Sequence, residues 1–423
     1  MFKRPPSLGA NVPALSSAVL TGLVVLLWAA LLLYGASALW WLVEVLALRS
    51  KSYHPESSFA HGLEEVQVRV LTIGAEDVVQ ATVNSVPDGV ADVRVIAEKP
   101  IDVEGARVHV VPEGFECAAT NKGRAIEWAR REVPCEREYV LYLDEDTLVT
   151  SLTGLPDADV VQFTEKPIYT GSALAYICEV FRVGYQIEQT AFDSLRYPLY
   201  AWGGGIAFRR EIEDAVTWDV PTVTEDTNFV WRAADHVDLD FAVVNARFRN
   251  QAPPSVTALV KQRRRWLSGT MQDDTLPTWY TPLAYTRVVA WAFSPLVPVL
   301  VVAAYLIPGS APGLELYGLV STCLLAVLVV YMLGGCLAYR KHPLLWPLFV
   351  LATPLAVVTH AIGALWGVIA PVETFEVTEK VTPETIEDVH ESTMERGDIA
   401  AHDGTERLVA DSADEYRWQV FDD

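Results

Sequence analysis

The stretch YVLYLDEDTLVT, residues 139–150, decides the fold. Its first five residues are apolar or aromatic and predict a strand buried inside a sheet. Three acids follow at once: Asp144, Glu145 and Asp146. In open α/β sheets, ligands bind beyond the carboxyl ends of the strands. The three acids therefore stand where such a sheet would hold a ligand.

Other strand-like runs surround this stretch and alternate with helical patterns. The strands read VQVRVLTIG (66–74), ADVRVIAE (91–98) and ARVHVVP (106–112), and NKGRAIEWARRE (121–132) has a helical pattern. Strands separated by helices predict an α/β domain with a largely parallel sheet. We place this domain in residues 60–275, whose composition is that of a soluble protein.

The whole chain combines apolar segments with a strongly acidic charge. It has 423 residues, of which 51% are hydrophobic, and a formal charge of −22. Lysine is scarce, with eight Lys against 24 Arg and 54 acidic residues. We interpret this lysine-poor, acidic composition as that of a halophilic protein. General nucleic-acid binding requires a basic surface, so the charge argues against it.

Two regions are apolar enough to enter a membrane. Residues 13–48 exceed the ~20 residues that one span needs, so a long tilted helix and a tight hairpin both fit. The run is also too long for the apolar part of a signal peptide. Three more apolar segments follow, at about 286–308, 314–339 and 343–370. The basic YRKH between the last two indicates a turn on the cytoplasmic side.

The acids that end the opening strand have two physical uses. Asp144 and Asp146 lie two residues apart, so in an extended segment they would point to the same side while Glu145 points away. Together they can hold Mg²⁺ or Mn²⁺, which prefer carboxylate ligands and bridge to substrate phosphates. Alternatively, they form a capped turn at the end of the strand.

Two further segments carry residues that can do chemistry. In VTEDTNFVWRA (223–233), Thr224 can cap a helix with two acids in its first turn, or one of those acids is a general base. In KQRRRWLSGT (261–270), the arginines can form a basic belt beside the membrane or clamp a diphosphate. The Trp of this segment can stack on a sugar or lie at the bilayer interface.

The order and spacing of these segments resembles the family-2 inverting glycosyltransferases of the GT-A fold. Those enzymes carry a DxD, then a TED, then a QxxRW and membrane helices. Cellulose, chitin and hyaluronan synthases share QxxRW, and FxVTxK marks cellulose synthases; ETFEVTEKV (373–381) matches it here. The resemblance implies an α/β fold class, a GT-A (Rossmann-like) glycosyltransferase domain inserted between transmembrane helices. The matching residues are Asp144, Asp146, Thr224, Glu225, Asp226, Gln262, Arg265, Trp266, Phe375, Val377, Thr378 and Lys380.

Within that family the chain looks most like the egghead-type β-mannosyltransferases. The resemblance extends from about residue 64 to 381. One departure is Gly74-Ala75-Glu76, where many family members have YNE. The similar segments are VRVLTIG (68–74), VRVIAEKPI (93–101), LYLDEDTLVT (141–150), YPLYAWGGGIAF (197–208) and QRRRWLSG (262–269).

The resemblance also implies roles for single residues. Asp144 and Asp146 would handle the donor diphosphate, with Mg²⁺ or Mn²⁺ bound at Asp146, and Glu145 would support them. Asp226, beside Glu225, would be the base that takes the proton of the acceptor hydroxyl. The residues implied to bind substrate are Thr72, Glu76, Glu98, Lys122, Arg124, Trp202, Gly203, Gln262, Arg264, Arg265, Trp266, Phe375, Thr378 and Lys380.

These roles imply a membrane enzyme that moves a hexose, with inversion, from a UDP- or GDP-sugar to a lipid-linked or glycan acceptor. One alternative is a processive polysaccharide synthase of the cellulose synthase-like type. Another is a non-catalytic membrane scaffold with a degenerate transferase domain, against which the intact motifs argue. The sugar, the nucleotide, the acceptor and the oligomeric state stay open.

The expected organisation has four parts: residues 1–59 with the N-terminal transmembrane segment or segments, the catalytic domain 60–275, apolar helices in 276–371, and an acidic tail, 372–423. Activated sugars are cytoplasmic, so the catalytic domain and the FxVTxK segment should both face the cytoplasm. Three full membrane spans would place the catalytic domain and the FxVTxK segment on opposite sides of the membrane. We therefore expect one apolar segment, within 343–370, to lie in the interface or to re-enter.

Overall fold

The computed structural model describes residues 17–48, 59–293, 306, 312–372, 378, 380–386, 406–411 and 415–420. Phe375, one of the expected substrate-binding residues, lies outside this set, as does much of the expected apolar segment 286–308.

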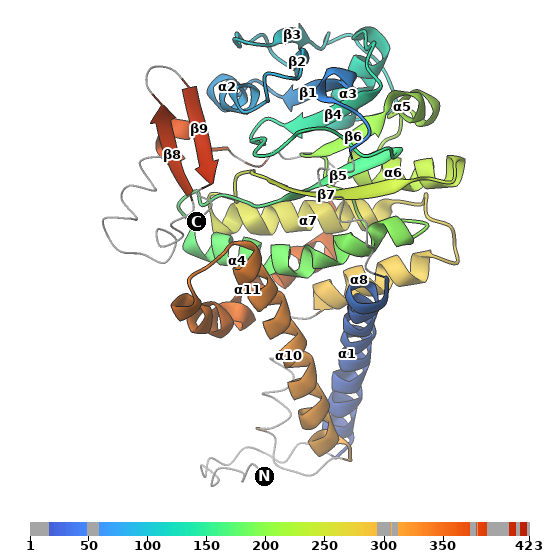
Figure 1. Ribbon diagram of the computed structural model, residues 1–423. Helices are drawn as coiled ribbons and strands as arrows, with labels where there is room; N and C mark the ends of the chain where they lie inside the picture. The colour runs from blue at the N-terminus through green and yellow to red at the C-terminus, as the bar shows by residue number, and fades with distance from the viewer. Residues whose placement is uncertain are drawn as a thin grey trace.

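A seven-stranded sheet forms the centre of the domain, in the order β3-β2-β1-β4-β6-β5-β7 (Figure 1). Strand β6 pairs antiparallel with both of its neighbours, and all other pairs are parallel. Strand β1, which lies between β2 and β4, is buried along its whole length, as expected of a strand covered on both faces. The prediction of a largely parallel α/β sheet is confirmed. The strands are β1 (Val66–Thr72), β2 (Asp92–Ala97), β3 (Arg107–Val110), β4 (Tyr139–Asp144), β5 (Val160–Glu165), β6 (Ile206–Arg209) and β7 (Phe241–Phe248).

Helices connect the strands and cover the two faces of the sheet. The predicted helix over 121–132 is α3, with the same bounds. Thr224 occupies the N-cap position of α6, as the sequence suggested, but its side chain makes no capping hydrogen bond. The helical segments of the domain are α2 (Glu76–Asn84), α3 (Asn121–Glu132), α4 (Ala173–Tyr185), the 3-10 segment η4 (Gln186–Ser194), α5 (Arg210–Val216), α6 (Glu225–His236) and α7 (Val256–Gln272).

Three helices of the described chain are long and apolar enough to cross a membrane: Ala18–Leu48, Leu314–Ala338 and Pro343–Ile369. The first is α1 (Ser17–Val43) continued by the π-helical η1 (Glu44–Leu48), so the single-helix alternative holds for the described part of 13–48. In Figure 1, α1 and α10 (Leu314–Ala338) extend together away from the sheet. The remaining apolar helices are α8 (Thr281–Phe293) and α11 (Trp346–Ile369), which follows the short 3-10 turn Pro343–Leu345.

More of helix α11 is buried than of the other two long helices, because it packs lengthwise against α7 of the catalytic domain. A Cβ atom added to Gly363 would lie 2.5 Å from the carbonyl oxygen of Val260 in α7, and one added to Gly367 would lie 2.5 Å from that of Arg264. These glycines let the two helix backbones approach closely. In Figure 1, α11 lies beside α4 and α7, which separate it from the sheet.

A buried ion cluster fastens the N-terminal helix to the domain. Arg287 of α8 donates to Glu44 at the end of α1 over 3.0 Å, and it also pairs with Glu188 of η4. Its Nε atom donates to the hydroxyl of Tyr185 at 3.0 Å. Arg287, Glu44 and Glu188 are buried, so breaking one of these pairs would leave an uncompensated charge. The cluster therefore fixes where α1 meets the catalytic domain.

Helices α4 and α10 cross at a pair of glycines. A Cβ atom on Gly335 would overlap the carbonyl oxygen of Val180, and one on Gly184 would overlap that of Tyr331. The overlapping atoms belong to the backbone, so neither helix can adjust by moving a side chain. Both glycines thus set the distance between α10 and the catalytic domain.

We predict that Gly335→Val will lower the free energy of unfolding by about 3 kcal/mol, the upper end of the usual cost of overpacking. The matched control is Gly22→Val in α1, because a Cβ atom there meets nothing within 4 Å. Thermal unfolding of both variants in detergent measures the difference. Equal melting temperatures would show that the α4–α10 crossing does not contribute to stability.

The described part of the acidic tail contains an antiparallel pair, β8 (Glu406–Asp411) and β9 (Glu415–Val420). The sequence analysis assigned no strand there, because acidic composition hid the short hydrophobic runs.

Candidate active site

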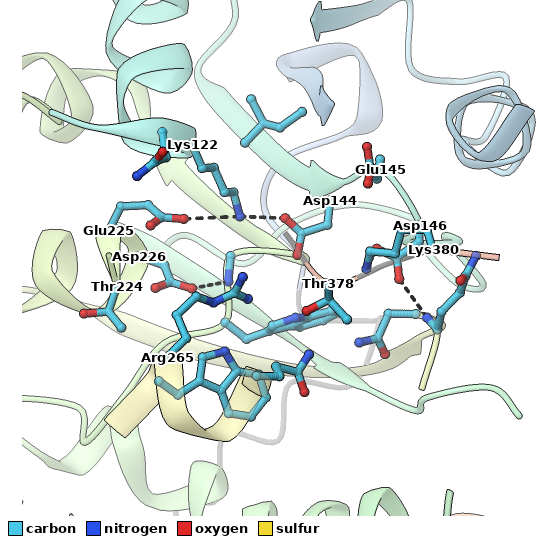
Figure 2. Close-up of a pocket in the computed structure, with 18 of the residues that line it drawn as sticks. Lys122, Asp144, Glu145, Asp146, Thr224, Glu225, Asp226, Arg265, Thr378 and Lys380 are labelled. Carbon is cyan, nitrogen blue, oxygen red and sulfur yellow. Dashed lines mark hydrogen bonds and ion pairs between the residues drawn. The ribbon is translucent and has the colours of Figure 1, made fainter. Parts of the chain in front are cut away.

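A cavity of about 470 Å³ opens at the carboxyl ends of the strands. Thr72 ends β1, Asp144 ends β4 and Glu165 ends β5, and all three line it. Figure 2 shows residues from the strand ends facing residues from α6, α7 and the segment after α11. Among the expected site residues, those that line the cavity are Thr72, Glu98, Lys122, Arg124, Asp144, Glu145, Asp146, Trp202, Gly203, Glu225, Asp226, Gln262, Arg265, Trp266, Thr378 and Lys380, and Thr224 joins them.

The three acids of the opening stretch form a turn rather than an extended segment. Strand β4 ends at Asp144, and the Thr147 N–H donates to the Asp144 carbonyl at 3.1 Å. The alternative of a turn at the end of the strand therefore holds, and strand alternation does not decide where Asp144 and Asp146 point. A turn lets each carboxylate take a separate partner, which keeps the like charges apart. Both aspartates still line the cavity.

Lys122 joins two of the acidic motifs. Its Nζ atom lies 2.6 Å from Asp144 Oδ1 and 3.6 Å from Glu225 Oε1 (Figure 2). Burial would lower the pKa of Lys122, but these two carboxylates outweigh burial and raise it. Burial would raise the pKa of Asp144, yet Lys122 and Lys380 hold it below its usual value. The pair is therefore ionised, and it positions the acids of β4 against those of α6.

Asp226 is held by backbone amides at the start of α6. Its Oδ2 accepts from the Gly203 N–H at 2.6 Å and its Oδ1 from the Thr227 N–H at 2.8 Å. A Cβ atom on residue 203 would lie 2.8 Å from Lys122 Nζ and 3.0 Å from Asp226 Oδ2. A side chain at position 203 would therefore displace the amine of Lys122 and crowd the carboxylate of Asp226.

The two acids of α6 share a buried environment. Burial, opposed by Lys122 and helped by Asp226, raises the pKa of Glu225 to about 7. Burial likewise raises the pKa of Asp226, against Lys122 and the two amide donors. Because the two carboxylates are adjacent, their protons leave in steps that belong to the pair. A carboxylate with a raised pKa is a stronger proton acceptor than an ordinary aspartate.

Asp146 is the most buried of the acids in the turn, at 3% exposure. Its Oδ2 accepts from the Gln251 N–H at 2.9 Å, and its Oδ1 lies 2.6 Å from Lys380 Nζ (Figure 2). No group of three metal-ligating side chains occurs among the described residues. Mg²⁺ is usually held by one or two carboxylates together with substrate phosphates. Asp144 and Asp146 therefore fit a cation that a bound diphosphate also ligates.

Other residues that the sequence analysis expected to bind substrate are also paired. Thr72 Oγ1 donates to Glu145 Oε2 at 2.6 Å, and burial raises the pKa of Glu145 against this hydrogen bond. Arg124 Nη1 contacts both carboxylate oxygens of Glu98, at 3.2 and 3.0 Å. Glu76, in contrast, does not line the cavity: it accepts from the Asp102 N–H at 3.0 Å.

Neighbouring arginines of α7 have different surroundings. Arg265 lines the cavity and points toward Asp226 in Figure 2. Arg264 does not line it: its guanidinium donates to the Ala370 carbonyl at 2.8 and 3.0 Å and lies 4.2 Å from the ring centre of Trp366. Successive helical residues point about 100° apart, and Arg264 lies on the side of α7 that faces α11.

The cavity also holds charged residues that the sequence analysis missed. Glu165 ends β5, and Glu179 and Arg182 lie one turn apart on α4. Their signal in the sequence is a charged pair inside the otherwise apolar run ALAYICEVFRVGY. Such a pair on a buried face needs partners or a function, because charges are costly to bury alone. Asn250 and Gln251, after β7, were missed as well.

A mixed α/β sheet with acids and cations at the carboxyl ends of its strands, followed by apolar helices, is the arrangement that the sequence analysis expected of a GT-A glycosyltransferase. Residues 139–370, more than half of the chain, match the Glycosyl transferase family group 2, and the chain belongs to this family. The predictions of the family, of the fold class and of an enzyme are confirmed. The finer resemblance to egghead-type and cellulose synthase-like proteins stays a prediction.

Solved structures of similar proteins are distant. The mannosyltransferase PcManGT from Pyrobaculum calidifontis, in complex with GDP-Man and Mn²⁺, is 15% identical with a TM-score of 0.46, over 83% of this chain and 99% of that one. Glucosyl-3-phosphoglycerate synthase from Mycobacterium tuberculosis is 17% identical with a TM-score of 0.33, over 52% of this chain and 81% of that one. No curated protein matches the chain.

Proposed function

We propose that this protein is a membrane-embedded, inverting, metal-dependent glycosyltransferase. It moves a hexose from a UDP- or GDP-sugar to a membrane-associated, lipid-linked or glycan acceptor. The observation that carries the proposal is the shared cavity, in which Asp226 faces Asp144 and Asp146 across the carboxyl ends of the strands. The acidic, lysine-poor composition further supports a high-salt habitat.

The charge of the cavity supports a need for a divalent cation. Eight carboxylates and five cationic side chains of the described residues line it. A nucleoside diphosphate adds further negative charge to this acidic site. Asp144 and Asp146 would hold Mg²⁺ or Mn²⁺ there, and the metal would act as a Lewis acid that neutralises the leaving diphosphate. Arg265 and Lys380 supply the remaining positive charge on that side.

The surroundings of Asp226 support its assignment as the general base. Two amide N–H groups fix its carboxylate at the start of α6, and its raised pKa suits it to accept a proton. It takes the proton of the acceptor hydroxyl while that oxygen attacks the anomeric carbon of the donor. The bond to the nucleoside diphosphate breaks on the opposite side, so the anomeric configuration inverts. This single displacement needs no nucleophile from the enzyme.

The raised pKa values predict an acid limb in the pH profile of turnover. Below the titration of the Glu225–Asp226 pair the base is protonated, so kcat should fall about tenfold per pH unit. The limb should lie at higher pH than for an ordinary aspartate. Glu225→Gln should move it to lower pH, because removing one acid of the pair eases ionisation of the other. A limb at the same pH in both proteins would contradict this coupling.

The helical arrangement supports a cytoplasmic catalytic domain with the described segment after α11 on the same side. Helices α1 and α10 extend together from the domain, whereas α11 packs against α7. Thr378 and Lys380, beyond α11, line the cavity. We therefore assign residues 343–370 to the interface and keep the four-part organisation proposed above. A reporter fused at residue 423 should be cytoplasmic, and an external reporter would contradict the assignment.

One observation favours the processive synthase as a second candidate. Thr378 and Lys380 belong to the FxVTxK segment that the chain shares with cellulose synthases, and Lys380 contacts Asp146 in the cavity. Product length separates the candidates: a single-addition enzyme gives one added sugar at any donor excess, and a synthase gives a ladder.

Nucleotide release by purified protein tests the proposed function. The protein in detergent and high salt is incubated with Mn²⁺ or Mg²⁺ and a panel of UDP- and GDP-sugars. Release with one donor is the expected result and names that donor. Protection from heat by one nucleotide, dependent on metal, would show an intact donor site even where an acceptor is missing. Neither release nor protection with any donor would overturn the proposal.

A further inference from the structure

Glu165 is a carboxylate of the cavity for which the proposed mechanism has no use. It ends β5 and is only 4% exposed. Its Oε1 accepts from Arg182 and, at 3.1 Å, from Gln186 Nε2. These two donors fix the orientation of the carboxylate. A side chain held this firmly at a strand end is placed to bind a ligand group in the cavity.

The second oxygen of Glu165 is left available. No hydrogen bond to Oε2 is found among the described residues, and Glu165 lines the cavity. Two of the acids assigned to the reaction differ in this respect. Asp146 and Asp226 each have partners on both carboxylate oxygens. Glu165 thus offers an ionic acceptor that the protein itself does not use.

The partners of Glu165 link it to the Trp of the QxxRW motif. Arg182 is held on its other side by Glu179, which also pairs with Arg263. The guanidinium carbon of Arg263 lies 4.1 Å from the ring centre of Trp266, and that of Arg182 lies 5.6 Å from it. These cation–π contacts hold the indole ring. Glu165 and Trp266 therefore belong to one rigid wall of the cavity.

This wall favours a ligand with hydroxyl groups over one with a phosphate. The positive charge of Arg182 is already shared between two carboxylates, Glu165 and Glu179, so it offers little to an added anion. A free carboxylate oxygen repels a phosphate and accepts a hydrogen bond from a hydroxyl. An aromatic ring beside it suits the apolar face of a sugar.

We infer that Glu165 accepts a hydrogen bond from a non-reacting hydroxyl of the acceptor sugar and so selects which hydroxyl reaches Asp226. The inference rests on the proposed function and adds a specificity residue to it. A hydrogen bond to a charged group contributes enough that its loss should raise the acceptor KM by about 10- to 100-fold. Donor binding and hydrolysis of the donor by water should not depend on it.

The test uses the full-length protein in a detergent without sugar headgroups. Acceptor probes are the octyl β-glycosides of glucose, mannose and galactose, and then versions of the best probe in which single hydroxyls are replaced by hydrogen. Glu165→Gln removes the charge, and Glu165→Asp keeps the pairing with Arg182 but withdraws the carboxylate from the cavity. The control is Glu211→Gln, at an exposed position of α5. The assays are nucleotide release with and without probe, and metal-dependent heat protection by the nucleotide.

The expected result is a higher acceptor KM in both Glu165 variants, with donor hydrolysis and heat protection within twofold of the parent protein. With the parent protein, one deoxy probe should raise the acceptor KM as much as Glu165→Gln does with the unmodified probe. Combining that probe with Glu165→Gln should raise KM no further, because the hydroxyl and the carboxylate form one contact. Additive losses for every probe, or equal losses in donor hydrolysis, would overturn the inference. Donor turnover that no sugar probe accelerates would also overturn it and leave the proposed function standing. A parent protein without release or protection would instead remove the proposed function.

Discussion

Replacing Asp226 by Asn should lower kcat for transfer by about 10²- to 10⁴-fold, the usual contribution of a general base. The amide has nearly the shape of the carboxylate, but it cannot take the proton of the acceptor hydroxyl. It can still accept one hydrogen bond, from Gly203 or from Thr227, so α6 should keep its start. Nucleotide release at saturating donor measures the loss.

A matched control comes from the same helix. Asp235 lies exposed near the end of α6 and accepts from the hydroxyl of Tyr197 at 2.5 Å. Asp235→Asn makes the same chemical change and should leave kcat within about twofold. Heat protection by the nucleotide should be alike in both variants, because neither change touches the donor diphosphate. A fully active Asp226→Asn would remove the base from the mechanism and direct attention to Glu225.

Asp146→Ala should have the second largest effect, through the donor rather than the acceptor. The side chain is buried, it contacts Lys380, and it is the residue at which we place the metal. Its loss removes several kcal/mol of charge stabilisation at the leaving diphosphate. We expect kcat/KM for the donor to fall by about 10³-fold. Heat protection by the nucleotide should no longer depend on Mn²⁺ or Mg²⁺.

Chelation checks the same prediction without a mutation. Excess EDTA should reduce the parent protein to the donor affinity of Asp146→Ala, and added Mn²⁺ should restore only the parent. Asp157→Asn serves as the charge control, because Asp157 does not line the cavity. Its carboxylate pairs with Arg209 at 2.5 Å. If metal still strengthened nucleotide binding in Asp146→Ala, the metal site would have to lie elsewhere.

The sequence by itself determined several of the strands and one helix on which the cavity is built. Alternation and apolar runs predicted β1, β2 and β4, and the helical pattern predicted α3 with the bounds that the structure has. Both signals are local, since they depend on which faces of one element are buried. Through the family resemblance, the motifs then predicted that Asp144 and Asp226 belong to one site.

Only the tertiary structure decided which charged side chains face that cavity. Arg265 faces it and Arg264 turns to Ala370, a difference set by how α7 crosses α11. Glu165 of β5 and Arg182 of α4 meet there in an ion pair, and no local pattern marks that contact. The periodicity of a helix or strand fixes on which face of that element a side chain lies. The packing of distant elements fixes what that side meets, because burial and charge pairing are satisfied between segments far apart in the chain.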